Sequence, residues 1–140
     1  MSKIEDIVKD YDYESLSEDR RISESEIPVY EDALGVKFGE QLKEYILKYG
    51  YLAYEHIEFN GVNANEKLDS DMIKNTKNIR NISDKIKDFI VVENQGDGDY
   101  YLIDSNDNMY EFILDGSSEL KKIDMDFSQY INNRFASVKK

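Results

Sequence analysis

The sequence has 140 residues, a length typical of one domain, and 40% of them are hydrophobic, which is enough to build a core without crosslinks. It has no cysteine, which excludes disulfides and thiolate chemistry, and it lacks the apolar runs of a signal peptide or a membrane span. The formal net charge of −12 disfavours direct binding to nucleic acid or an anionic membrane. That charge serves solubility or a basic protein partner, and we expect a cytoplasmic protein.

The first half of the chain predicts helices. Residues 1–22 are expected to be partly helical, because their first apolar residues fit one helical face. Ser23 or Ser25 then provides an N-cap for a helix with Pro28 in its first turn and Gly35 at its end. A second helix is predicted from about 39 to 49, and Gly50 ends it. Its apolar stripe consists of Leu42, Tyr45, Ile46 and Tyr49.

The rest of the chain predicts mainly strands. Short strands are expected at 51–54 and 56–59, followed by a modest helix at about 71–79. Further strands are predicted at 89–92, 100–104, 109–114 and 120–123. Asp126 or Ser128 then caps a final helix. This order predicts a single α+β domain with N-terminal helices, a mainly antiparallel sheet meander and a C-terminal helix.

Residues suited to catalysis or metal binding are few. His56 is the only histidine, and strand alternation would place it on the same face as Tyr54 and Glu58. The segment from Asp104 to Asp115 resembles a calcium loop, but Met109 replaces the glycine that the sharp turn needs. We therefore expect no catalytic residues, no metal and no cofactor. An enzyme that uses only carboxylates remains a minor alternative.

All charged residues from Asp88 to Leu120 are acidic, because no Lys or Arg occurs between them. This segment is the acidic window. Three tyrosines lie inside this window. Two roles are open for its aspartates Asp97, Asp99 and Asp104, which are as suitable for forming turns as for contacting a partner.

Three motifs in order resemble the SUKH superfamily of the SMI/KNR type. The first is a helix ending in Leu34-Gly35, an apolar link through Phe38, and a helix ending in Tyr49-Gly50. The second is a strand, a Gly98-Asp99 turn, an aromatic strand ending in Asp104, and another strand. The third is the closing helix, which begins Asp126-Phe127 and continues to Ile131. Gly39 stands where the family usually has a proline.

The resemblance implies a SUKH-like domain at 23–133, preceded by an N-terminal segment at 1–22 and followed by a tail at 134–140. It also implies an immunity protein that binds a cognate bacterial toxin and neutralises it by occluding its active site, and the expected toxin is a nuclease. The alternative is a regulatory or scaffold module of the same fold that binds another protein. The expected partner is a cognate toxin with a basic surface.

Acidic residues interleaved with tyrosines in the Asp88–Leu120 window are the predicted partner-binding site, because tyrosine is a common interface anchor and carboxylates complement basic grooves. The site residues are Asp97, Asp99, Tyr100, Tyr101, Asp104, Tyr110 and Glu111. Tyr100 and Tyr101 alternate in a strand, so one is expected to face outward and the other to enter the core. Asp97 and Asp107 are expected at the rim.

Overall fold

The computed structural model describes residues 3–63, 70–96, 98–114 and 119–138. The helices are α1 (Lys3–Val8), α2 (Ile27–Leu34), α3 (Glu40–Lys48), α4 (Met72–Ile82) and α5 (Phe127–Ala136). The strands are β1 (Ala53–Tyr54), β2 (Ile57–Glu58), β3 (Ile90–Asn94), β4 (Asp99–Ile103), β5 (Asn108–Ile113) and β6 (Glu119–Asp126). Short 3₁₀ turns lie at Glu18–Arg20, Glu24–Glu26 and Asp84–Ile86.

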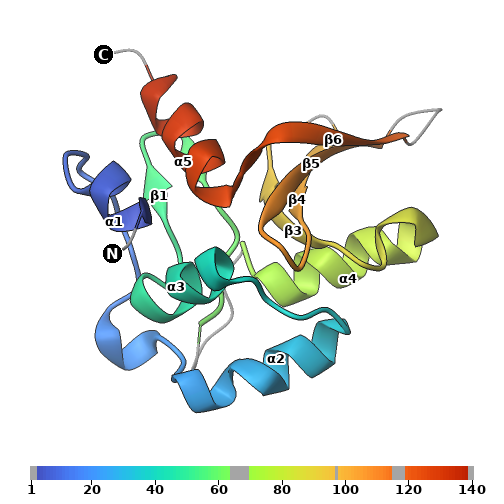
Figure 1. The fold of residues 1–140 in the computed structure, drawn as a ribbon, viewed down its shortest axis with the longest axis horizontal. Helices are drawn as coiled ribbons and strands as arrows, with labels where there is room; N and C mark the ends of the chain where they lie inside the picture. Colours follow the sequence, from blue (N-terminus) through green and yellow to red (C-terminus); the bar gives the residue numbers. More distant parts are fainter. Residues whose placement is uncertain (1–2, 64–69, 97, 115–118, 139–140) are drawn as a thin grey trace.

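The central element is a four-stranded antiparallel sheet whose strands lie in the order β3-β4-β5-β6, the order in which they occur in the chain (Figure 1). Each of these strands pairs antiparallel with the next one along the chain. A separate two-stranded ladder joins β1 to β2. With helices before the sheet and α5 after it, the predicted α+β single-domain fold is confirmed.

The two predicted helices of the first half both form, but the N-cap residue of α2 is Glu26 and not Ser23 or Ser25, because a 3₁₀ turn at Glu24–Glu26 precedes the helix and Ser23 caps that turn instead. Glu26 accepts a hydrogen bond from the Ser23 backbone N–H at 2.9 Å, which organises the turn before α2. Gly35 follows α2 with φ of 68°, the left-handed conformation that glycine adopts at little cost. Helix α3 then buries its predicted stripe, and Leu42, Tyr45 and Ile46 are each 0% exposed.

Apolar residues pack on both faces of the sheet. On one face, α3 and α5 contribute to the larger core, together with Ile90 and Ile103 from the strands. On the other face, Ile79 of α4 and Ile86 pack against Leu102 and neighbouring strand residues. The sheet therefore separates two apolar clusters.

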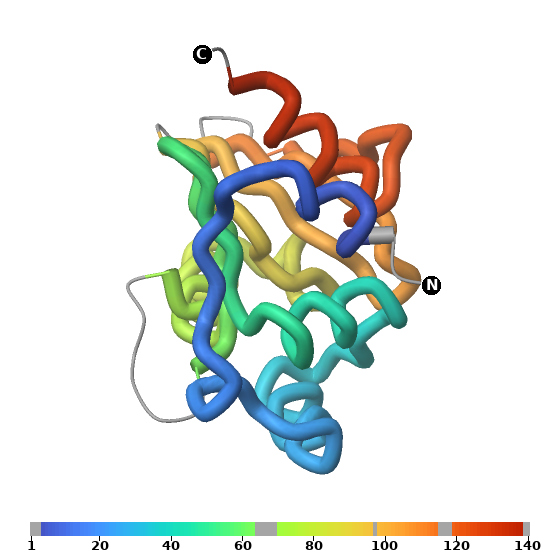
Figure 2. Tube along the Cα trace, turned by 90° about the vertical axis from the view of Figure 1, so that its left-hand side faces the viewer, coloured from blue at the N-terminus to red at the C-terminus, as the bar shows by residue number. Residues whose placement is uncertain are grey.

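Helix α1 packs into the larger core. Ile4 and Val8 are buried in that core, and α1 lies against α5 although the two helices are at opposite ends of the sequence (Figure 2). The following segment pairs with the small ladder through an antiparallel bridge between Glu14 and Ala53.

His56 differs from its prediction. It is exposed in the turn between β1 and β2, whereas Tyr54 is buried in β1. Strands β1 and β2 are only two residues each, and Glu55 between them has φ of 55°, which helps to reverse the chain. The strand alternation that placed His56 with Tyr54 and Glu58 does not extend across this turn.

Candidate protein-binding site

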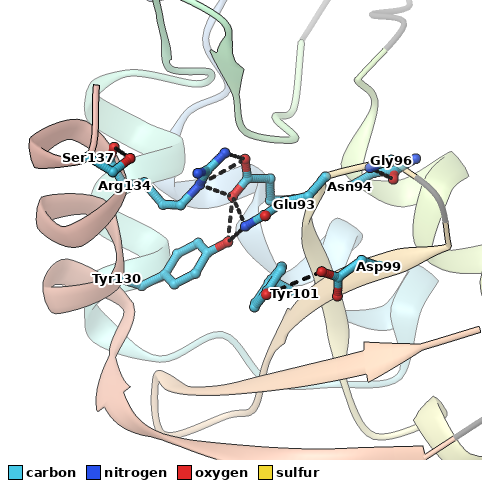
Figure 3. Close-up of polar contacts among 9 residues, drawn as sticks. Glu93, Asn94, Gly96, Asp99, Tyr101, Tyr130, Arg134 and Ser137 are labelled. Carbon is cyan, nitrogen blue, oxygen red and sulfur yellow. Dashed lines mark hydrogen bonds and ion pairs between the residues drawn. The ribbon is translucent and has the colours of Figure 1, made fainter. Parts of the chain in front are cut away.

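Helix α5 is tied to the sheet by a buried ion pair. Glu93 on β3 is 2% exposed, and its carboxylate accepts hydrogen bonds from Arg134 Nη2 at 2.7 Å and Arg134 Nε at 2.9 Å (Figure 3). The Tyr130 hydroxyl donates to the same carboxylate, and Gln95 Nε2 donates to the Tyr130 oxygen at 3.0 Å. Tyr130 and Arg134 are four residues apart, so both side chains leave α5 on the face toward the sheet.

The protonation states in this cluster reinforce the pairing. Burial lowers the pKa of Arg134, but the hydrogen bonds and charge of Glu93 outweigh burial and raise it overall. Burial and the Glu93 charge both raise the pKa of the Tyr130 hydroxyl, so it stays protonated and donates. The cluster fixes α5 on the sheet and leaves its own charges satisfied.

Tyr101 lies next to this cluster and joins it to two carboxylates. Its ring stacks on Tyr130 with the ring centroids 5.2 Å apart. Its hydroxyl donates to Glu111 Oε2 at 2.9 Å and lies 3.4 Å from Asp99 Oδ2. One phenol carries one proton, so it can serve only one of these carboxylates fully at a time.

The carboxylates of Asp99 and Glu111 beside Tyr101 lack enough hydrogen-bond donors. Asp99 and Glu111 lie on the same face of the sheet because Tyr101, two residues after Asp99, is directly opposite Glu111. Burial, and then the charge of Glu111, raise the pKa of Asp99. Asp99 Oδ1 is buried and makes no hydrogen bond within the described residues.

A cleft of about 560 Å³ opens between this face of the sheet and α5. Tyr101 and Glu111 contribute to its lining from the central strands, and Asn133 and Arg134 contribute from α5. Strand β6 supplies both charged and apolar lining residues, including Lys121, Ile123 and Met125. The cleft therefore offers an aromatic surface, carboxylate and amide groups and the basic side chains of Lys121, Lys122 and Arg134, a mixture that suits recognition of a protein surface.

The other predicted site residues lie on the opposite face of the sheet. Tyr110 packs edge-on against Phe89, with their ring centroids 4.6 Å apart, and its hydroxyl donates to Asp104 Oδ2 at 3.2 Å. Tyr100 packs against the same smaller apolar cluster. Asp104 also accepts backbone bonds from Asn106 and Asn108, each at 2.9 Å, and so forms the hairpin turn.

The structure places the predicted partner-binding residues on two opposite faces of the sheet. Asp99, Tyr101 and Glu111 come together beside α5, whereas Tyr100, Asp104 and Tyr110 lie on the α4 side. Tyr100 and Tyr101 do point to opposite faces, but both are half-buried, because each face of the sheet carries an apolar cluster. Asp97 lies outside the described residues.

Asp107 is not a rim carboxylate as predicted. It is 6% exposed at the tip of the β4–β5 hairpin, and it accepts hydrogen bonds from the backbone N–H groups of Gln41 at 3.0 Å and Leu42 at 3.1 Å. These are orphan donors at the start of α3. Burial raises the pKa of Asp107, although the two backbone hydrogen bonds act in the opposite direction. Asp107 is therefore a helix cap supplied by a distant hairpin.

Sequence reasoning did not identify Glu93, Gln95, Tyr130 or Arg134 as one cluster. The i, i+4 spacing of Tyr130 and Arg134 signals a shared helix face. A glutamate directly after the apolar run Ile90–Val92 signals a buried charge that needs a partner. Which glutamate meets which arginine depends on how α5 docks.

Metal-binding side chains do not gather in the part of the chain that the structure describes. No group of three or more histidine, cysteine, aspartate or glutamate side chains there could hold a metal ion. His56 lies exposed in its turn, outside the residues that line the cleft. In the same described ranges, no helix is long and apolar enough to cross a membrane.

Comparison with known proteins identifies the family. A search of curated proteins finds no match to the chain. A family model, SUKH_5, described as SMI1-KNR4 cell-wall, matches residues 4–136. The match extends over nearly the whole chain and includes α1 and α5 as well as the sheet. The chain therefore belongs to the SUKH superfamily, within its SMI1-KNR4 family.

Proposed function

We propose that this protein is an immunity protein that binds a cognate bacterial toxin with a basic surface, a nuclease in particular, and occludes its active site. The SUKH superfamily is known for toxin-immunity domains and is generally non-catalytic, which supports a protein partner. The observation that carries the proposal is the half-buried Tyr101 flanked by Asp99 and Glu111 at the cleft beside α5.

The chemistry of this group fits a basic partner. Tyrosine gives a large contact area at a small loss of rotamer freedom, and Tyr101 is already held by its stack on Tyr130. Asp99 and Glu111 share a single phenol proton, so a cation from a partner would satisfy acceptors that the free protein leaves poorly satisfied. The net charge of −12 would speed encounter with a positively charged toxin.

The first test is co-expression with the product of the adjacent gene. We expect that product to be toxic alone, to be tolerated in the presence of this protein, and to co-purify with it. A toxic neighbour that this protein neither binds nor neutralises would contradict the proposal. Binding to a non-toxic neighbour would instead support the regulatory or scaffold alternative.

The second test locates the interface with a matched pair of variants. Tyr101→Ala and Tyr110→Ala each remove one aromatic pair and one hydroxyl bond to a carboxylate, but they lie on opposite faces of the sheet. We expect Tyr101→Ala to raise the dissociation rate of the toxin complex at least roughly tenfold, as a hot-spot residue would, with little change for Tyr110→Ala. Equal effects of the two variants would place the interface elsewhere.

Charge variants test the association step separately. Glu111→Gln beside the cleft and Asp104→Asn on the far face each remove one negative charge. We expect Glu111→Gln to lower the association rate more than Asp104→Asn, and we expect added salt to reduce that difference. An association rate independent of salt would contradict steering by this acidic surface.

A further inference from the structure

A second cleft, of about 600 Å³, lies on the other side of α5 from the cleft beside Tyr101. Asp6, Asp10 and Tyr11 contribute to its lining from the N-terminal segment, and α5 contributes its amide side chains. Figure 1 shows α5 between α1 and β6, and the helix separates the two clefts. We name them the α1 cleft and the Tyr101 cleft.

The α1 cleft carries negative charge. Asp6 and Asp10 are the charged residues of its lining, and within the described residues no lysine, arginine or histidine joins them. The start of α5 does not offset this charge with free donors. Its first three N–H groups donate to Asp107 O, Gln41 Oε1 and Asp126 Oδ1, at distances of 2.9, 2.8 and 2.9 Å. The α1 cleft therefore fits a cation and not an anion.

An arginine side chain matches the groups in the α1 cleft. The carboxylates of Asp6 and Asp10 can accept the N–H groups of a guanidinium and oppose its charge. Tyr11 adds an aromatic ring, and arginine packs favourably against aromatic rings. Edge contacts hold that ring in place, with its centroid 5.0 Å from that of Tyr54 and 5.2 Å from that of Phe135. The amide oxygens of α5 are further acceptors.

The exposed face of α5 between the two clefts has no charge. Gln129, Asn132, Asn133 and Ala136 are exposed there, and their spacing of three and four residues places them along one ridge. The other helices each expose at least one charged side chain among the described residues, for example Glu5 on α1, Asp32 on α2, Glu40 on α3 and Lys74 on α4. Interface centres are depleted in charge, and amides adapt their hydrogen bonds to a partner. The α5 ridge has this composition although the chain carries a net charge of −12.

The Tyr101 cleft alone is too small to be the whole interface. A stable protein interface covers about 800 Å² on each partner. A cleft of about 560 Å³ admits only a few side chains, so a partner in it must also cover a neighbouring surface. The α5 ridge leads from the Tyr101 cleft to the α1 cleft, where the two aspartates are complementary to a basic partner.

We propose that the toxin contacts α5 on both sides, with the uncharged ridge at the centre of the interface and an arginine side chain of the toxin in the α1 cleft. This inference rests on the proposed function and defines the part of the interface that lies beyond the Tyr101 cleft. The N-terminal segment then contributes binding residues of its own, in addition to packing α1 against α5.

The first test uses the protein encoded by the adjacent gene as the probe and measures its association and dissociation rates. Asp6→Asn/Asp10→Asn removes the two charges of the α1 cleft. Asp32→Asn/Asp88→Asn is the control, because it removes two exposed charges outside both clefts. Both double variants should slow association through the loss of negative charge. Only the α1-cleft variant should raise the dissociation rate, by roughly tenfold or more, because only it removes contacts made in the complex.

The second test fills the α1 cleft with a cation from the chain itself. Asn132→Arg introduces a guanidinium at the lining of this cleft, and Asn78→Arg makes the same substitution at an exposed position of α4. We expect Asn132→Arg to weaken toxin binding roughly tenfold or more without lowering the thermal midpoint of unfolding, since arginine is a good helix former. Asn78→Arg should leave both quantities unchanged.

The outcomes separate this inference from the proposed function. If Tyr101→Ala weakens the complex but the variants at Asp6, Asp10 and Asn132 do not, the second half of the interface is wrong and the proposed function stands. Control variants that raise the dissociation rate as much as the α1-cleft variants would also overturn the inference. A toxic adjacent-gene product that does not bind the wild-type protein would overturn both.

Discussion

Asp107 caps α3, and three substitutions at this position should show how much the cap contributes to the free energy of unfolding. Gly39 is the N-cap residue of α3 and has no side chain to accept the first N–H groups of the helix. A Cβ at position 39 would lie 2.4 Å from Asp107 Oδ1, so the glycine makes room for the carboxylate that does accept them. Asp107 itself has φ of 66°, a conformation that is unfavourable for most residues.

Asp107→Gly removes the cap but suits the left-handed backbone. Loss of an N-cap costs about 0.5–2 kcal/mol, and a buried N–H left without a partner costs about 1–3 kcal/mol. We therefore expect Asp107→Gly to lower the free energy of unfolding by about 2–3 kcal/mol. Asp107→Ala adds about 1–2 kcal/mol for a Cβ in the left-handed region, so its loss should be about 3–5 kcal/mol. Asp107→Asn keeps one acceptor and tolerates that region, so it should cost least.

Urea denaturation of the three variants at one pH measures these differences. The expected order of destabilisation is Asn, then Gly, then Ala. An alanine variant no less stable than the glycine variant would refute the backbone part of the reasoning. A glycine variant that loses less than about 0.5 kcal/mol would refute the cap, because that loss is within the range of ordinary surface substitutions.

Three further predictions concern stability. Ile46→Ala in α3 should cost about 2–5 kcal/mol in a denaturant titration, because Ile46 is 0% exposed. Arg134→Met leaves the Glu93 charge buried and should cost about 3 kcal/mol, part of which the double variant with Glu93→Gln should recover. The folded-state pKa of Asp99 is raised, by burial first and then by Glu111, above its unfolded value near 3.9. Asp99→Asn should therefore stabilise the protein at pH 7 by less than about 1 kcal/mol after solvent screening, and thermal melts should show this gain shrinking as pH falls through the folded pKa toward the unfolded one.

Local signals were sufficient for the helices and for most strands. Pro28 and Gly35 bound α2 because the first suits a helix start and the second a left-handed end. Of the two residues predicted to cap α5, Asp126 or Ser128, the structure has Asp126 as the cap, and its side chain accepts from the Gln129 N–H. The strand predicted at 120–123 is longer in the structure, Glu119–Asp126, since pairing with β5 supports residues whose own preference for strand is weak.

Contacts between distant residues could not be read from local pattern. Asp107 looked like an exposed turn aspartate, because nothing near it in sequence shows that Gln41 and Leu42 need its oxygens. Glu93 ends an apolar run and signals a buried charge, but its partner Arg134 lies 41 positions later. The position of each residue depends on how the hairpin and α5 dock, which is a property of the whole fold.

Strand alternation limits which of the predicted residues can belong to one interface. The acidic window is continuous in sequence, yet a strand sends neighbouring residues to opposite faces, so the window cannot act as one surface. Its α5-side residues Asp99, Tyr101 and Glu111 lie together, and Tyr101 and Glu111 line the cleft beside Arg134. A partner that contacts Tyr101 in this cleft must therefore also meet α5, although α5 lies outside the window. Substitution of Asn133 on the cleft side of α5 should then weaken the same complex as Tyr101→Ala, while changes at Tyr110 should not.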